Sequence, residues 1–290
     1  MTQQDNKIPN YRLTPQHRRM LGKSGAAHKY DHGHAVVVSG PPGQGGAARL
    51  AARGALRMGA GLVSVFTSPE GQPEHAARLD AIMVKSHKSG TFAEQLSALK
   101  PSAICTGPNL GLDQTSAEQL FETLSLELPM CLDADAITHI ARAPDRLGGI
   151  SLSRSVMTPH EGELRRLIPE AFERTSCRTT LARTAARKMG CCVLFKGPDT
   201  IIARPDGGCV IVRSGPYPHA AWLATAGSGD VLSGFVTGLM ARGFEAFDAT
   251  ALGAHLHLQA AQQVGPGLIA EDLPEALPAV LAQILTQKED

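Results

Sequence analysis

Short apolar runs alternate with longer segments of helical periodicity from residue 35 onward. The runs are rich in Val, Ile, Leu and Cys, which is typical of strands buried on both faces of a sheet. The runs that predict strands are Ala35–Ser39, Leu62–Thr67, Ala103–Thr106, Met130–Leu132, Ser155–Thr158 and Cys191–Phe195. The segments that predict helices are Ala47–Met58, Phe92–Leu99, Ser116–Leu124, Thr179–Met189 and most of the chain after Asp230.

This alternation predicts an α/β fold built from βαβ units around a mainly parallel sheet. Two further runs, Thr200–Ala203 and Gly208–Arg213, flank an Asp-Gly turn and predict an antiparallel hairpin. Residues 1–30 are polar and show little periodicity, so we expect them to lead into the domain. No repeat or linker divides the 290 residues, and one domain over 1–290 is expected.

Composition and charge exclude several classes of protein. The 28 basic residues nearly balance 27 acidic ones, so the clustered positive face of a nucleic-acid-binding protein is not expected. The six cysteines form no C-x-x-C pair, which argues against a zinc site or a disulfide framework. The polar start lacks a secretory signal, and no run of about 20 apolar residues predicts a membrane span. We expect a cytoplasmic location and no membrane partner.

The motif Ala226-Gly227-Ser228-Gly229-Asp230 precedes a helical pattern. Two glycines separated by one residue permit a sharp turn, after which the backbone N–H groups at the start of the helix can bind an anion. A carboxylate at this place would be repelled by a bound phosphate unless it takes part in the chemistry. We therefore predict that Asp230 is a general base and that the loop amides bind a phosphoryl group, in preference to a plain helix cap.

The glycine-rich segment after the first predicted strand leaves two interpretations open. Gly43, Gly45 and Ala48 fit the loose G-x-G-x-x-A pattern of dinucleotide-binding loops, and Glu70 follows at about the position of a ribose-binding acid. The segment lacks the Gly-Lys-[Ser/Thr] of a phosphate-binding P-loop. A tight turn between strand and helix is an equally good explanation.

Other polar motifs follow predicted strands, at the edge where parallel sheets place their working loops. Lys196 could reach a phosphate as a point charge, or could be an exposed loop lysine. Asp133 and Asp135 could contact Mg²⁺ through water, or Asp135 could cap a helix. Thr158–Glu163 lacks an H-E-x-x-H pattern and favours a capped turn, and Gly107–Gly111 favours a plain turn.

Taken in order, these motifs resemble those of the ADP-dependent NAD(P)H-hydrate dehydratases, a branch of the ribokinase-like superfamily. The resemblance covers most of the chain, with Tyr30 and Asn109 standing where glycines are usual and Glu161 where a proline is usual. The matching segments are His28–His34, Gly45–Ala48, Gly59–Val63, Gly107–Gly111, Asp133–Ala136, Thr158–Glu163, Lys196–Thr200, Ala226–Asp230 and Gly267–Leu273.

The resemblance implies a three-layer α/β/α ribokinase-like fold and a hydro-lyase that repairs the hydrated nucleotides NADHX and NADPHX. The family transfers a phosphoryl group from ADP to the ring hydroxyl of the S form, and NAD(P)H is restored as AMP and phosphate are released. Asp230 is then the base, with Gly227 and Gly229 beside the phosphoryl group. The implied substrate contacts are Ala47, Gly107, Asn109, His160 and Asp230, and the implied nucleotide contacts are Lys196, Gly197, Pro198, Asp199, Thr200 and Gly229.

The resemblance also implies a homotetramer and Mg²⁺, for which Glu163 and Asp133 are candidate neighbours. Some relatives carry a second, epimerase domain, for which 290 residues are too few, so we expect any epimerase to be a separate protein. Three other functions stay open. They are a ribokinase-like kinase for a small vitamin precursor, a nicotinamide-dependent oxidoreductase that uses Gly43, Gly45 and Glu70, and a nucleotide-sensing binding protein.

Overall fold

The computed structural model describes residues 8–87 and 90–286. Nine strands of this described chain form one sheet in the order β3-β2-β1-β4-β5-β6-β7-β8-β9. The pairs from β3 through β7 are parallel, while β8 pairs antiparallel with both β7 and β9. The strands are β1 (His34–Val38), β2 (Leu62–Thr67), β3 (Met83–Ser86), β4 (Ala103–Thr106), β5 (Met130–Leu132), β6 (Ser155–Met157), β7 (Cys192–Phe195), β8 (Thr200–Ala203) and β9 (Cys209–Val212).

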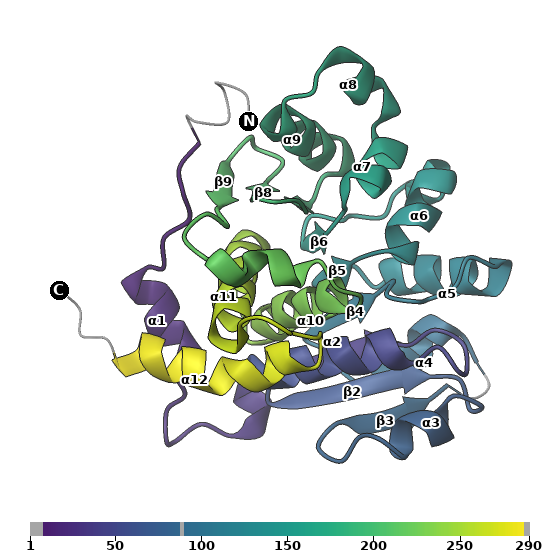
Figure 1. Cartoon of the computed structure of the whole chain (residues 1–290). Coiled ribbons are helices and arrows are strands. Elements are labelled where there is room, and N and C mark those ends of the chain that lie inside the picture. Colours follow the sequence, from purple (N-terminus) through teal and green to yellow (C-terminus); the bar gives the residue numbers. More distant parts are fainter. Residues whose placement is uncertain (1–7, 88–89, 287–290) are drawn as a thin grey trace.

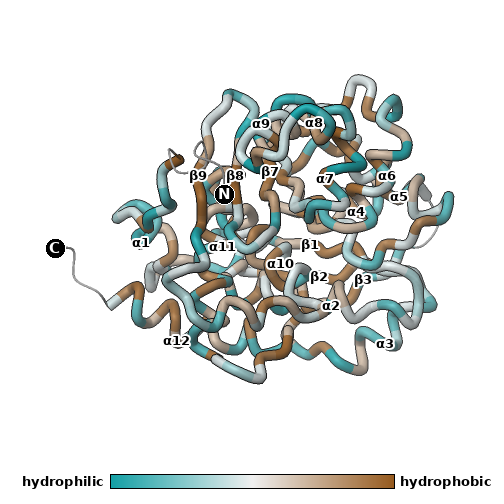
Figure 2. Tube along the Cα trace, turned by 45° about the horizontal axis from the view of Figure 1, so that its top comes forward, coloured by the Kyte–Doolittle hydropathy of each residue, from teal (hydrophilic) through white to brown (hydrophobic). Residues whose placement is uncertain are grey.

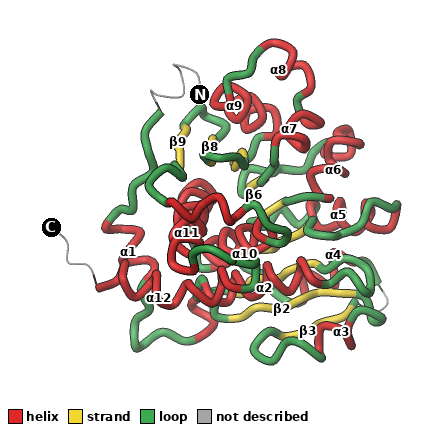
Figure 3. The backbone as a smooth tube through the Cα atoms, viewed as in Figure 1, coloured by secondary structure: helices red, strands yellow, loops and turns green. Residues whose placement is uncertain are grey.

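Helices cover both faces of the sheet, so the fold has three layers (Figures 1 and 3). One layer contains α2, α10, α11 and α12, and the opposite layer contains α4 to α9. The helices are α1 (Pro15–Leu21), η2 (Lys29–His32), α2 (Gly46–Arg57), α3 (Gln72–Ala76), α4 (Phe92–Ala98), α5 (Gln114–Leu124), α6 (Asp135–Arg142), η3 (Pro144–Leu147), α7 (Glu161–Leu167), α8 (Pro169–Arg174), α9 (Arg178–Met189), η4 (Pro218–Leu223), α10 (Ser228–Ala241), α11 (Ala246–Val264) and α12 (Asp272–Thr286).

Two hydrophobic cores lie on opposite faces of the sheet, because successive strand residues point to opposite sides. Val37 is level with Val65 on β2 and Cys105 on β4, and all three are buried against α2, α10 and α11. Their neighbours Val36 and Ile104 face the other core. The strands are therefore apolar on both faces, which explains the continuous apolar runs in the sequence and the brown strands at the centre of Figure 2.

The expected fold class is confirmed, including the mainly parallel sheet and the antiparallel hairpin of β8 and β9 at its edge. The sheet reverses its winding between β1 and β4, since β1 pairs with both β2 and β4. In open α/β sheets ligands bind at the carboxyl edge near such a point. The loops after β1 and β4 touch there: a Cβ at Gly40 would lie 1.6 Å from the carbonyl oxygen of Asn109, so only glycine fits.

The described part of the N-terminal lead-in is more ordered than its sequence pattern predicts. Helix α1 begins at Pro15 after a capping box formed by Thr14 and His17, and Arg18 donates to the Ile284 carbonyl of α12 at 2.7 Å. Asn10 pairs alongside Ile211 of β9. Residues 1–7 of the lead-in lie outside the described chain. Within the described residues, no helix combines the length and apolar character that a membrane crossing requires.

Candidate active site

A buried ion pair lies at the carboxyl edge of the sheet. Lys196, directly after β7, donates from Nζ to Asp133 Oδ1 at 2.8 Å, and Asp133 directly follows β5. Ser233 of α10 donates to the other carboxylate oxygen of Asp133 at 2.7 Å. Asp133 is only 2% exposed, and burial alone would favour its neutral form, but Lys196 and Ser233 hold the pKa of its carboxyl below the ordinary range. The two predicted residues therefore form one charged unit.

Helix α10 begins beside this ion pair. Gly227 precedes the helix with φ +87°, a left-handed conformation that favours glycine, and a Cβ there would lie 2.6 Å from Leu50 Cδ1 of α2. A Cβ at Gly229 would face Lys196 Nζ at 3.7 Å and Asp133 Oδ2 at 4.0 Å. Within the described chain, the amides of Gly227, Gly229 and Asp230 donate no hydrogen bond. The start of α10 thus presents free N–H groups next to a lysine.

Asp230 lies in the first turn of α10, partly exposed. Burial of its carboxyl, followed by the negative charge of Asp133, raises its pKa from 3.8 to about 6, against the opposing effect of Lys196. Burial also disfavours the charge of Lys196, but the carboxylates of Asp133 and Glu163 outweigh it and raise the pKa of the ammonium. A carboxylate with a raised pKa is a better proton acceptor near neutral pH, while its lysine neighbour stays charged.

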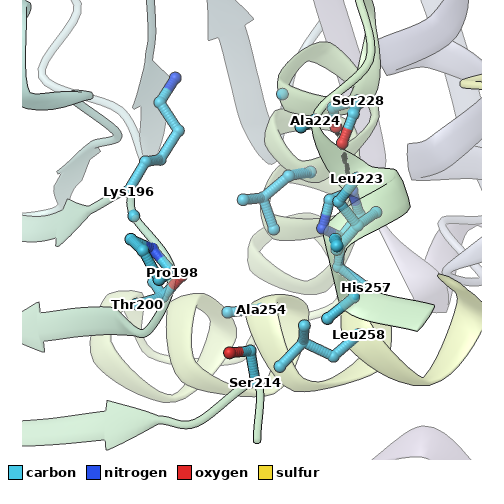
Figure 4. Close-up of a pocket in the computed structure, with 15 residues that line it drawn as sticks. Lys196, Pro198, Thr200, Ser214, Leu223, Ala224, Ser228, Ala254, His257 and Leu258 are labelled. Atoms are coloured by element: carbon cyan, nitrogen blue, oxygen red, sulfur yellow. Dashed lines mark hydrogen bonds between the residues drawn. The ribbon is translucent and has the colours of Figure 1, made fainter. Parts of the chain in front are cut away.

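A cavity of about 620 Å³ opens beside the start of α10. Figure 4 shows Lys196, Pro198 and Thr200 on one side, with Leu223, Ala224, Ser228 and His257 on the opposite side. Its lining is mostly apolar, and the polar side chains that line it are Lys196, Thr200, Ser214, Ser228 and His257. Five of the six predicted nucleotide contacts line this cavity, and they are Lys196, Gly197, Pro198, Thr200 and Gly229.

The sixth predicted contact, Asp199, has a different task in this structure. Its carboxylate accepts from the backbone N–H of Ser214 at 2.9 Å and from Arg213 at 3.3 Å, so it ties the loop after β7 to the end of β9. Arg178, the first residue of α9, donates to the carbonyls of Asp199 and Lys196 at 2.8 and 3.0 Å. Arg178 is absent from the sequence predictions, because its partners are backbone carbonyls that no local pattern reveals.

His257 is a second residue that sequence reasoning missed. It projects from α11 into the cavity wall, and its Nε2–H donates to the Ser228 carbonyl at 3.0 Å (dashed in Figure 4). Burial lowers its pKa to about 4, so the ring is neutral at physiological pH. His257 therefore fixes the first residue of α10 without adding charge to the cavity.

His160 caps helix α7. Its Nδ1 accepts from the backbone N–H groups of Gly162 and Glu163 at 2.9 and 3.3 Å, and the Glu163 carboxylate accepts from the His160 N–H at 2.8 Å. The capped turn that the sequence favours is therefore present, with histidine as the capping residue. Glu163 also lies 4.0 Å from Lys196 Nζ, which joins this turn to the charged cluster.

The loops after β4 and β5 interlock. A Cβ at Gly107 would lie 1.8 Å from the Asp133 carbonyl oxygen, so this predicted substrate contact is also required for packing. Asn109 has φ +51°, and asparagine tolerates the left-handed region better than most residues, which explains how it replaces a glycine there. Ala134 adopts φ +47° and ψ −112°, a strained conformation directly after Asp133. Asp135 bonds the Gly111 amide at 3.0 Å and does not cap α6.

The glycine-rich loop after β1 is already occupied by a carboxylate. Glu74 of α3 accepts from the N–H groups of Gly43 and Gly45 at 2.7 and 3.0 Å and lies 3.5 Å from Arg49. A phosphate bound by these two amides would have to displace this carboxylate. The oxidoreductase interpretation therefore lacks its anion site, and among the described residues the carboxylate of Glu70, its predicted ribose contact, accepts no hydrogen bond from this loop. Ala47, the remaining predicted substrate contact, is buried in the first turn of α2.

Comparison with known proteins assigns the chain to a family. The family model described as NAD(P)H-hydrate dehydratase matches residues 35–281. The chain belongs to the NAD(P)H-hydrate dehydratase family. It is 34% identical to the bifunctional NAD(P)H-hydrate repair enzyme Nnr of Moorella thermoacetica, over 98% of this chain and 58% of that protein. It is 29% identical to the Nnr enzyme of Escherichia coli, over 98% of this chain and 54% of that protein. The chain thus spans a little over half the length of these relatives.

Solved structures show the same fold. A ribokinase-like protein from Enterococcus faecalis superposes with a TM-score of 0.76 at 24% identity, covering 95% of this chain and 96% of its own. An ADP/ATP-dependent NAD(P)H-hydrate dehydratase from Bacillus subtilis, co-crystallised with ATP and Mg²⁺, gives 0.75 at 24% identity, covering 96% and 99%. A hydroxyethylthiazole kinase from Pyrococcus horikoshii gives 0.62 at 16% identity, covering 90% and 94%. The three-layer fold is common to dehydratases and small-molecule kinases, so the fold alone does not choose between them.

Proposed function

We propose that the protein dehydrates the S form of hydrated NADH and NADPH, using ADP as the phosphoryl donor. The observation that carries the proposal is the position of Asp230. Burial raises the pKa of its carboxyl to about 6, and it lies in the first turn of α10 directly after Gly229, which lines the cavity together with the other predicted nucleotide contacts. Family membership and the likeness to relatives named for NAD(P)H-hydrate repair support this substrate.

The chemistry follows from these groups. The Asp230 carboxylate takes the proton of the ring hydroxyl, and the hydroxyl oxygen attacks the terminal phosphorus of ADP. The bond from that phosphorus to the bridging oxygen breaks and AMP leaves. Lys196 and the amides of Gly227 and Gly229 stabilise the charge on the transferring phosphoryl oxygens. Phosphate then leaves the ring carbon, the adjacent carbon loses a proton, and the double bond of NAD(P)H is restored.

The candidate Mg²⁺ neighbours do not fit as direct ligands. Both oxygens of Asp133 are engaged, by Lys196 and by Ser233, and Glu163 bonds the backbone of His160. The described residues contain no group of three or more His, Cys, Asp or Glu arranged to hold a metal ion. Mg²⁺ commonly binds through substrate phosphates and water rather than through a protein cage. Mg²⁺ is therefore added to the assay together with the nucleotide.

The test follows the absorbance of the reduced nicotinamide. The protein is incubated with hydrated NADH or NADPH, separated into S and R forms, with Mg²⁺ and with either ADP or ATP. We expect recovery of absorbance with the S form and ADP, and release of AMP in equal amount. Recovery with ATP alone would keep the dehydration and overturn the donor.

Asp230→Asn is the diagnostic variant, because it keeps the shape of the side chain and removes the base. We expect the rate to fall about 10²- to 10⁴-fold, with nucleotide affinity unchanged. No recovery by the wild type with either donor would refute the proposal. Formation of a stable phosphate ester on a small alcohol would instead establish the kinase.

A further inference from the structure

A second cavity lies on the other side of the loop that precedes α10. It has a volume of about 380 Å³ and is lined by residues from the first turns of α2, from the segment after α3 and from the segment before α12. The lining residues are Gly46, Arg49, Leu50, Arg53, Arg78, Leu79 and Glu271. It shares no lining residue with the cavity that contains Lys196.

Three arginines and one glutamate line this cavity, so its lining carries a net positive charge. Arg49 pairs with Glu74, the residue that also holds the loop after β1. The side chains of Arg53 and Arg78 make no ion pair or hydrogen bond with any residue in the described ranges, although they come from separate elements and line the same space. Two unpaired guanidinium groups that face one cavity suit phosphate oxygens, which they can bind in a bidentate manner.

The cavity adjoins the predicted reaction centre through Leu50. This side chain lines the cavity, and its Cδ1 would lie 2.6 Å from a Cβ at Gly227. Ala270, the neighbour of Glu271, lies on the same side, since its Cβ would be 2.9 Å from a Cβ at Gly227. The loop that holds the transferring phosphoryl group therefore separates two cavities, one on the Lys196 side and one on the arginine side.

We propose that the arginine-lined cavity binds the phosphate groups of the dinucleotide that is repaired. The inference rests on the proposed function, because it takes the Lys196 cavity as the site of the phosphoryl donor. With the donor on that side of Asp230, the second nucleotide has to reach Asp230 from another direction. A dinucleotide carries its pyrophosphate away from the nicotinamide ring, and NADPH adds a phosphate on the adenosine ribose. Arg53 and Arg78 supply the counter-charge for one of these groups.

Direct binding of the reaction products tests the inference without any turnover. NADH and NADPH are fluorescent, and their affinity is measured by titration against the wild type, R53Q, R78Q and the double variant. The matched control is R57Q, which removes an exposed arginine from the same helix, one turn beyond Arg53. Arg57 pairs with Glu275 and does not line the cavity. The affinity for ADP, measured in parallel, shows that every variant is folded.

We expect the double variant to bind at least about tenfold more weakly, since each lost pairing is a charge-assisted hydrogen bond to phosphate. An equal loss of affinity for NADH and for NADPH would place the pyrophosphate in the cavity. A loss of affinity for NADPH alone would place the ribose phosphate there. The inference is overturned if the double variant binds both products like the wild type. It is also overturned if R57Q weakens binding as much, or if the wild type binds neither product.

The same preparations separate this inference from the proposed function. If the wild type restores no absorbance, but binds NADPH more tightly than the double variant does, the proposed function fails and the cavity assignment stands. If the wild type is an active dehydratase and the double variant keeps its KM for both hydrates, the function stands and the cavity assignment fails. If both hold, the double variant raises the KM for the hydrate and leaves the KM for ADP unchanged.

Discussion

Replacing Asp230 by Asn should lower the rate about 10²- to 10⁴-fold and make the protein more stable above pH 6. The pKa of this carboxyl is 3.8 in an unfolded chain and about 6 in the fold. Between these values the folded state holds a proton that the unfolded state has released, so the free energy of unfolding falls as the pH rises. Above pH 6 the carboxyl is ionised in the fold, and the free energy of unfolding is lowered by the full amount, because burial and the charge of Asp133 oppose the ionised form.

The size of the effect follows from the same two values. At 1.36 kcal/mol for each pH unit, their difference corresponds to at most about 3 kcal/mol. Because Asp230 is partly exposed, solvent screening reduces this, and we expect about 1–2 kcal/mol. In a domain of this size such a gain raises the melting temperature by about 2–5 °C.

Thermal melts of the wild type and Asp230→Asn between pH 4 and pH 8 measure the gain. The difference should be smallest near pH 4, grow through pH 5 and 6, and level off above pH 7. Asp80→Asn, which removes an exposed carboxylate outside the cluster, is the control and should leave the melting temperature unchanged. An Asp230→Asn variant that is less stable than the wild type at pH 8, or whose advantage does not vary with pH, would refute this reasoning.

The activity gives a second measure of the same ionisation. The base must be ionised to accept a proton, so kcat/KM should rise with pH and reach a plateau above an apparent pKa of about 6. If kcat/KM and the difference in melting temperature rise over the same pH range, both changes belong to the Asp230 carboxyl. If kcat/KM rises at a clearly different pH, another group controls the proton transfer.

Three further predictions concern residues around the Lys196 cavity. Lys196→Met leaves the buried Asp133 without its counter-charge and should lower the free energy of unfolding by about 2–4 kcal/mol in a denaturant titration, with part of the loss recovered by adding Asp133→Asn. His257→Leu removes the donor to the Ser228 carbonyl and should lower kcat/KM for ADP about tenfold, whereas His257→Gln restores part of it and neither variant shifts the pH profile, because the ring is already neutral. Trp222, the single tryptophan of the chain, is 45% exposed on η4, and its neighbours Ala221 and Leu223 line the cavity, so ADP should change its emission and Trp222→Phe should remove that signal without loss of activity.

The fold was largely predictable because the strands are buried on both faces and therefore appear as uninterrupted apolar runs. Several shorter elements escaped this signal, namely strand β3 and helices α1, α3, α6, α7 and α8. Strand β3 (Met83–Ser86) is at the sheet edge and half exposed, with Lys85 pointing to solvent, so its pattern resembles a loop. Helix α1 has seven residues and buries only His17 and Leu21, which is too short for a helical period to be recognised.

The site was predictable where one loop supplies several groups and obscure where groups meet across the sheet. The spacing of Gly227, Gly229 and Asp230 predicts free amides beside an acid, and the structure contains them. The ion pair of Lys196 with Asp133 joins residues 63 positions apart. The hydrogen bond from the Gly43 amide to Glu74 joins residues 31 positions apart. No local pattern encodes such contacts, because they depend on the order of strands in the sheet.

Burial is the main cause of the raised pKa of Asp230, and the charge of Asp133, which adds to it, is placed there by that strand order. Asp133 and Lys196 follow β5 and β7, with β6 between them, so the sheet brings both to the start of α10. If Asp133 were absent, Lys196 would pair with Asp230 and hold the pKa of its carboxyl low, which makes a poor base. Asp133 engages the lysine and adds a negative charge of its own, so Asp230 keeps its basicity while the cation remains available to phosphate. On this argument the buried ion pair supports the proposed chemistry as well as the fold.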